Sequence, residues 1–121
     1  MLLAEFTATE ASAKAQITVS SFPGDVGGLL ANLNRWRRQV SLPPIDDTAV
    51  SQATSALSLA AGPATQADFT GTDGKTGQPA RMIGVILPLN GQTWFYKLMG
   101  DPTVVEHQKA DFLKFVQSVK Y

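Results

Sequence analysis

The feature that most constrains the fold is the dipeptide Asn90–Gly91, which separates two long apolar runs. The first run is ARMIGVILPL at residues 80–89, and the second is TWFYKLMG at residues 93–100. Asn-Gly readily adopts the positive φ angles of a two-residue hairpin turn. The pattern therefore predicts two antiparallel strands that pair with each other.

The second of these strands is apolar on both of its faces. Side chains alternate along a strand, so Trp94, Tyr96 and Leu98 share one face. The other face carries Thr93, Phe95, Lys97 and Met99. Such a strand must lie in the centre of a sheet or under a helix, which predicts helical cover. We expect Trp94 and Tyr96 to lie in the core, whereas the pattern leaves Phe95 open between core and surface.

A helix is predicted over residues 26–40, where apolar residues recur every three or four positions. The residues of this stripe are Val26, Leu29, Leu30, Leu33, Trp36 and Val40. We expect Asp25 to be its N-cap and to accept a bond from the amide of Gly27 or Gly28. Three arginines at its end complement the helix dipole.

The other elements follow from the same two periodicities. Strands are predicted at residues 2–8, 15–19, 57–62 and 65–73, a short helix from Asp46 or Asp47 to residue 56, and a C-terminal helix over residues 103–119. Together they predict an α+β fold: an antiparallel sheet of about five to seven strands, covered by the 26–40 helix and the C-terminal helix. At 121 residues, one domain spanning 1–121 is expected.

Composition argues against several classes of protein. Ten Lys and Arg balance ten Asp and Glu, so no global field favours nucleic acid or an anionic membrane. There is no cysteine, so thiolate metal sites and cysteine nucleophiles are excluded, and compartment stays open on that ground. The longest apolar run, residues 82–89, is too short to span a bilayer. We therefore expect no nucleic-acid partner and no direct membrane insertion.

The Gly-rich stretch GDVGG at residues 24–28 precedes the predicted helix, as phosphate-binding turns do. Its spacing matches neither G-x-G-x-x-G nor G-x-x-x-x-G-K-[ST], and it lacks the lysine of the second motif. Asp25 also places an anion where a phosphate would lie. We expect a backbone junction that lets the helix approach the sheet, and the alternative is an anion site at the helix start.

No set of residues assembles a recognisable active site. His107 is the single histidine, and Glu106 beside it points in another direction on a helix. Adjacent Asp46 and Asp47 follow two prolines and are typical of helix capping. The sequence predicts no catalytic residues, no metal site and no cofactor, and we expect a protein that is not an enzyme.

The candidate binding surface combines one basic cluster with two aromatic residues. Its residues are Arg35, Trp36, Arg37, Arg38, Trp94 and Phe95. One helical turn of positive charge offers few phosphate contacts, so an acidic patch on a protein partner fits it better than nucleic acid. For Trp36 and the arginines, the structural interpretation is a core anchor beside hydrated, dipole-complementing cations.

Two segments carry a resemblance to known proteins: FPGDVGGLLANLNRWRRQVSLPP at 22–44 and GQTWFYKLMGDPTVVEHQKADFLKFVQSVKY at 91–121. They resemble uncharacterised bacterial proteins that are exported or lipoprotein-like, and the element order is similar to the PsbP/Mog1-like α/β/α sandwich. The resemblance implies a non-catalytic binding or assembly module outside the cytoplasm, periplasmic or membrane-anchored. The sequence begins with a strand rather than a leader, so we expect a longer precursor.

These observations predict a module that acts through protein contacts. One alternative is a small-molecule carrier with an apolar pocket walled by Trp36, Trp94 and Phe112. A less favoured alternative is a small enzyme with titratable groups around His107 and the Asp46–Asp47 pair. The oligomeric state is not readable from the sequence.

Overall fold

The computed structural model describes residues 2–121 and contains one six-stranded antiparallel sheet with three helices. The strands are β1 (Leu2–Glu10), β2 (Ala13–Pro23), β3 (Thr54–Leu59), β4 (Gly62–Thr72), β5 (Pro79–Leu89) and β6 (Gln92–Gly100). The helices are α1 (Leu29–Gln39), α2 (Asp47–Ala53) and α3 (Pro102–Ser118). This confirms the predicted fold class.

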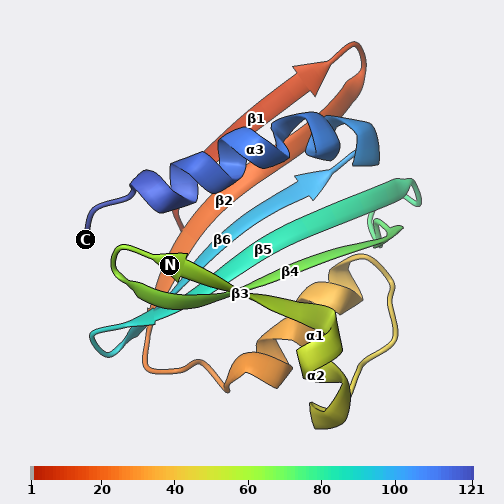
Figure 1. Ribbon diagram of the computed structural model, residues 1–121. Helices are drawn as coiled ribbons and strands as arrows, with labels where there is room; N and C mark the ends of the chain where they lie inside the picture. The colour runs from red at the N-terminus through yellow and green to blue at the C-terminus, as the bar shows by residue number, and fades with distance from the viewer. Residues whose placement is uncertain (1) are drawn as a thin grey trace.

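The strand order across the sheet is β1-β2-β6-β5-β4-β3, so the β5–β6 hairpin lies at its centre (Figure 1). Asn90 and Gly91 have φ angles of 53° and 78°, as a two-residue hairpin turn with two positive φ angles requires. The pairing Leu89↔Gln92 directly flanks this turn. The prediction of a central, two-sided strand for residues 93–100 is confirmed.

Helix α3 covers one face of the sheet and buries the larger core. Tyr96, Leu98 and Val85 from the central strands meet Phe112 and Val116 of the helix, and all five are buried. Asp101 caps the helix by accepting bonds from the amides of Thr103 and Val104, and Pro102 occupies the first turn.

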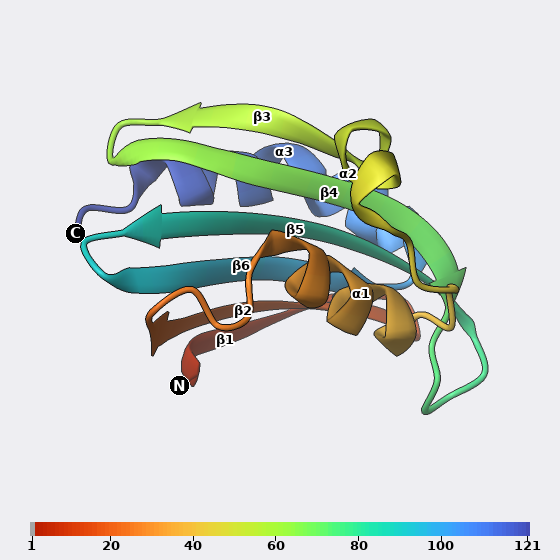
Figure 2. The same cartoon turned by 90° about the horizontal axis from the view of Figure 1, so that it is seen from below.

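Helix α1 lies across the opposite face, so the sheet is enclosed between α1 and α3 (Figure 2). The ring of Trp36 lies on the backbone of β5 at Gly84, where a Cβ atom would come within 2.1 Å of the ring. Phe95 is buried beside Trp36, with 6.0 Å between the two ring centroids. The position left open for Phe95 is therefore in this second core.

The start of α1 differs from the prediction. The helix begins at Leu29, because Val26, Gly27 and Gly28 all have positive φ angles that a right-handed helix cannot adopt. The N-cap is Gly28 and has no side-chain bond. Asp25 does accept a bond from the Gly27 amide at 3.3 Å, but it forms a turn before the helix and is not the N-cap.

Other boundaries also shift. The first two strands are longer than predicted and leave only residues 11–12 as their turn. Asp46 caps α2 as predicted, accepting a bond from the Ala49 amide. That helix ends at Ala53, three residues early, because Thr54 enters an extended conformation and begins β3. Among the helices of residues 2–121, none has both the length and the apolarity to cross a membrane.

Candidate functional site: a basic groove over β2 and β6

Helix α1 leaves part of its sheet face uncovered, and a groove runs there along β2 and β6. Three adjoining hollows form it, each sharing lining residues with the next. The central hollow measures about 500 Å³. We call this feature the basic groove and define it by its polar and charged lining. Those residues include Lys14, Gln16, Thr18, Arg35, Arg38, Gln39, Asp73, Lys75, Lys97 and Asp101.

Strand register fixes the floor of the groove. Thr18 of β2 lies opposite Lys97 of β6, and Gln16 lies opposite Met99. Because the side-chain period of a strand is two, these residues point to the face opposite Tyr96 and the α3 core. Outside the cover of α1, the floor therefore carries Gln16, Thr18 and Lys97 together with the apolar Met99.

Helix α1 forms one wall. Arg35 and Arg38 are three positions apart and hence lie on the same side of the helix. Gln39 follows in the last turn, where backbone bonds from Thr72 and Gly74 tie the end of α1 to β4 and the next loop. This attachment holds the two arginines beside the floor of the groove.

Lys97 is the most constrained cation of the groove. Its Nζ atom donates a hydrogen bond to Oε1 of Gln39 at 2.8 Å, and the side chain is partly buried. Burial lowers the pKa of the Lys97 ammonium, and the like charges of Arg35 and Lys75 lower that pKa further. An anion bound here would remove part of this electrostatic cost.

The groove carries an excess of positive charge although the chain as a whole is neutral. Five basic and two acidic side chains line it. Within residues 2–121, the ion pairs join Arg81 to Asp68 and Glu106, Lys109 to Asp68, and His107 to Glu10. None of them includes a groove cation.

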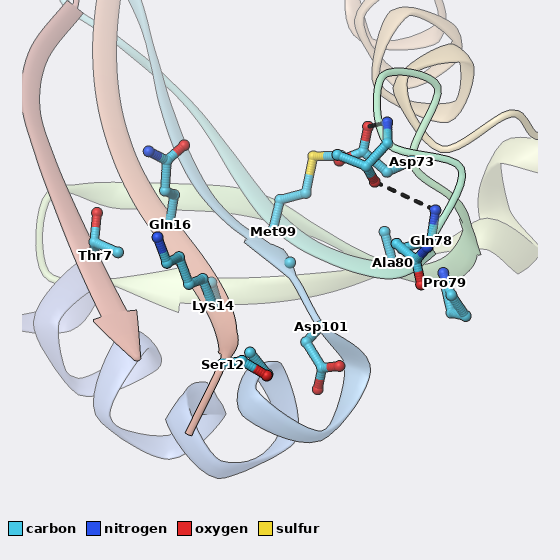
Figure 3. Close-up of a pocket in the computed structure, with 14 residues that line it drawn as sticks. Thr7, Ser12, Lys14, Gln16, Asp73, Gln78, Pro79, Ala80, Met99 and Asp101 are labelled. Carbon is cyan, nitrogen blue, oxygen red and sulfur yellow. Dashed lines mark hydrogen bonds between the residues drawn. The ribbon is translucent and has the colours of Figure 1, made fainter. Parts of the chain in front are cut away.

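The two acidic side chains of the groove are engaged by backbone amides. Asp73 accepts bonds from the amides of Lys75 and Thr76, and Asp101 caps α3. Figure 3 shows this end of the groove, where Lys14 projects from β2 and Met99 extends from β6 toward Asp73. On the outer side, Glu5 of β1 accepts a bond from Gln16 at 3.2 Å. The charge is thus mixed at this end. In the central hollow three cations, Arg38, Lys75 and Lys97, outnumber Asp73, which lines both hollows.

The structure divides the sequence-predicted surface. Arg35 and Arg38 line the groove, whereas Trp36 and Phe95 are each only 3% exposed and contribute at most an edge to its wall. Arg37 points elsewhere: its Nε atom donates to the Pro43 carbonyl, and its guanidinium lies 5.9 Å from the Phe69 ring centroid. Trp94 belongs to the α3 side. These six residues therefore do not form one surface.

The prediction of a carrier pocket walled by Trp36, Trp94 and Phe112 is wrong, because these residues lie on two faces of the sheet. Trp36 of α1 packs against one face of the sheet. Trp94 of β6 and Phe112 of α3 pack in the core on the other face. Residues of one strand alternate between faces, so the sheet itself separates these rings. They cannot wall one pocket.

The groups considered for an enzyme have separate structural partners. His107 of α3 is exposed, and its Nδ1 atom lies 2.7 Å from Oε1 of Glu10 on β1. Asp46 caps α2 and accepts a bond from the Thr48 hydroxyl, which holds the pKa of its carboxyl below the usual value. Within residues 2–121 no group of three or more His, Asp or Glu is placed to hold a metal ion.

Sequence reasoning missed the residues at the centre of the groove. Lys97 stands alone among apolar neighbours in TWFYKLMG, and a lysine on such a strand needs a route to water. That signal was present in the sequence. The contributions of Gln39 and Lys75 depend on how α1 and the 73–78 loop dock, which periodicity does not reveal.

Comparisons with known proteins agree with the fold. No family model matches the chain, and no curated protein matches it. A solved structure is similar: a protein of unknown function, PA94 from Pseudomonas aeruginosa, described as a candidate regulator. The two share 12% sequence identity with a TM-score of 0.64, covering 98% of this chain and 81% of that one. At this identity the likeness shows that the chain shares its fold with a bacterial protein of unknown function.

Proposed function

We propose that the protein is a non-catalytic binding module whose basic groove binds carboxylates of a protein partner. The observation that carries this proposal is the cluster of Arg35, Arg38, Lys75 and Lys97 around two adjoining hollows, with none of the four in the ion pairs of residues 2–121. Like charges held together raise the free energy of the unbound state, and an acidic ligand lowers it.

The way Lys97 is held supports the same proposal. A lysine that served only solubility would extend into water, whereas Lys97 is fixed by Gln39 at a cost in desolvation. Placing a desolvated cation in a concave site strengthens its attraction for an anion, because the local dielectric is lower than that of water.

The place of action is part of the proposal. The resemblance of residues 22–44 and 91–121 to exported bacterial proteins supports a role outside the cytoplasm, and the two-sided cover of the sheet supports a PsbP/Mog1-like assignment. Fractionation of the native host with an antibody against the chain would test location directly. Recovery only with cytoplasmic markers would contradict it.

The test of the binding function is a pull-down with charge-reversed variants. Arg35→Glu combined with Arg38→Glu should abolish recovery of a partner that the wild-type protein captures, and raised salt should release that partner. The matched control is Lys114→Glu combined with Lys120→Glu, which changes net charge equally on exposed side chains outside the groove. Equal recovery by both variants would contradict the proposal.

A further inference from the structure

The basic groove has the shape of a channel for an extended chain, and this inference rests on the proposed function. The three hollows follow β2 from Lys14 to Phe22. A strand rises roughly 3.3 Å per residue, so this segment extends over about 30 Å. A single carboxylate or a small ion would occupy only the central hollow.

The two ends of the groove differ in chemistry. At the end near the start of α1, the Phe22 ring is 36% exposed and meets the buried Phe95 ring edge-on at 6.0 Å. Leu2, Leu3, Phe6 and Tyr121 are the other large apolar residues with comparable exposure in residues 2–121, and they do not line the groove. Phe22 thus offers an apolar contact directly beside the cations.

The arginine next to this contact links the two chemistries. The Arg35 guanidinium lies 5.4 Å from the Phe95 ring centroid, and Lys97 follows along the floor. A ligand crossing the hollow therefore meets an aromatic surface first and the cluster of cations next. Asp73 lines both the central hollow and the next one, where the ligand also meets Asp101 and Lys14.

We infer that the ligand is an extended peptide segment with an acidic stretch over Arg38, Lys75 and Lys97 and an aromatic or aliphatic side chain against Phe22. Charge complementarity limits the acidic part to the middle of the groove, where three cations line the hollow with one aspartate whose carboxylate is bonded to backbone amides. A phosphate backbone running its whole length would instead place negative charge beside Asp73 and Asp101, so the groove fits a peptide better than a nucleic acid.

Fluorescence anisotropy with labelled synthetic peptides tests this ligand class. One probe contains a short run of Glu with a Phe a few residues away, made in both chain directions, and a second probe replaces that Phe by Ser. Lys97→Gln should raise the Kd for both probes about tenfold, as loss of a charge-assisted contact predicts. Phe22→Ser should weaken the Phe-containing probe about tenfold, in its better-binding direction, and leave the Ser probe unchanged.

The matched control is Phe6→Ser, which removes a more exposed ring (Phe6 is 52% exposed and Phe22 36%) on β1 outside the groove and should change the affinity for neither probe. Phe22→Leu should retain most of the difference in affinity between the Phe-containing and Ser-containing probes, and circular dichroism of each variant checks folding.

If Phe22→Ser lowered the affinity for both probes equally, this inference would be overturned while the acidic-partner proposal stayed intact. Tighter binding of a single-stranded oligonucleotide than of either peptide would also overturn it. The proposed function itself fails only if partner recovery is insensitive to Arg35 and Arg38.

Discussion

At the scale of single residues, the contact between Gly84 and Trp36 determines how closely α1 approaches the sheet. A Cβ atom at Gly84 would come within 2.1 to 2.8 Å of three ring atoms of Trp36. The ring packs on the β5 backbone itself, so glycine is needed here for space and not for an unusual φ angle. This contact also positions Arg35 and Arg38, the neighbours of Trp36 on the groove wall.

We therefore expect Gly84→Ala to lower the free energy of unfolding by about 1–3 kcal/mol, as overpacking of a core does. Urea denaturation measures this change. The double variant Gly84→Ala with Trp36→Leu should lower the free energy of unfolding by less than the sum of the two single variants. The smaller leucine at position 36 leaves room for the added methyl group at position 84. Strictly additive costs would contradict the steric explanation.

A second residue-scale prediction concerns Asp68 on the α3 side. The hydrogen bonds from Arg81 hold the pKa of the Asp68 carboxyl below its usual value despite partial burial, and Lys109 lowers that pKa further. A carboxyl whose pKa is lowered by folding adds stability above the unfolded pKa and loses it as the pH falls through the folded pKa.

Asp68→Asn should consequently lower the free energy of unfolding by about 1 kcal/mol at pH 7, the usual size of a partly exposed charged contact. The difference from wild type should narrow as the pH falls below about 4. Urea denaturation at several pH values measures it. Asp111→Asn, on the exposed surface of α3, is the control for loss of a carboxylate outside the Arg81 contact. A difference that stays constant down to pH 2 would contradict the role assigned to the Arg81 contact.

At the scale of elements, the sequence predicted the order and type of the strands and helices, and it placed boundaries best where two independent signals agreed. The β5–β6 hairpin had both an apolar alternation and Asn90–Gly91. The segment of α3 had an apolar stripe directly after Asp101 and Pro102, residue types that are typical of a helix start. The start of α1 failed because Val26 continued the helical spacing of apolar residues while its backbone adopts φ 54°. Periodicity reports which side chains are buried, and a β-branched residue in the left-handed region is invisible to it.

The two aspartate caps allow a comparison between helices. Asp101→Ala should lower the free energy of unfolding by about 1 kcal/mol, because α3 carries Val104, Val105, Phe112 and Val116 into the core. Asp46→Ala removes the same kind of bond from α2, which buries no residue. It should therefore lower the free energy of unfolding clearly less than Asp101→Ala does. Thermal unfolding followed by circular dichroism compares the two. A larger effect of Asp46→Ala would show that α2 matters more than its burial indicates.

At the scale of the whole molecule, the sheet is the shared wall of two cores, and this arrangement limited what the sequence could reveal about the site. Alternation along residues 93–100 correctly separated the two faces, yet nothing in it showed that α1 covers only part of one face. The uncovered part became the groove, and its central Lys97 was visible in the sequence only as an exception to an apolar pattern. Arg35 and Arg38 were found because they cluster in sequence. Lys75 joins them only through packing of the 73–78 loop, and Gln39 of α1 reaches Lys97 only because the helix docks on β6.

The two tryptophans report on the two cores separately. Trp36 of α1 lies in the core on one face of the sheet, and Trp94 lies on the α3 side. Strands β5 and β6 contribute buried residues to both cores. Because the same central strands support both layers, loss of either layer exposes the strands that hold the other. We therefore expect Trp36→Phe and Trp94→Phe variants, each with one remaining tryptophan, to show fluorescence transitions in urea that coincide with their own circular dichroism transitions. Each variant is its own control, because the comparison is between two probes in one protein. An earlier fluorescence transition in the variant that retains Trp36 would show instead that α1 detaches first, and the groove would then be lost before the sheet unfolds.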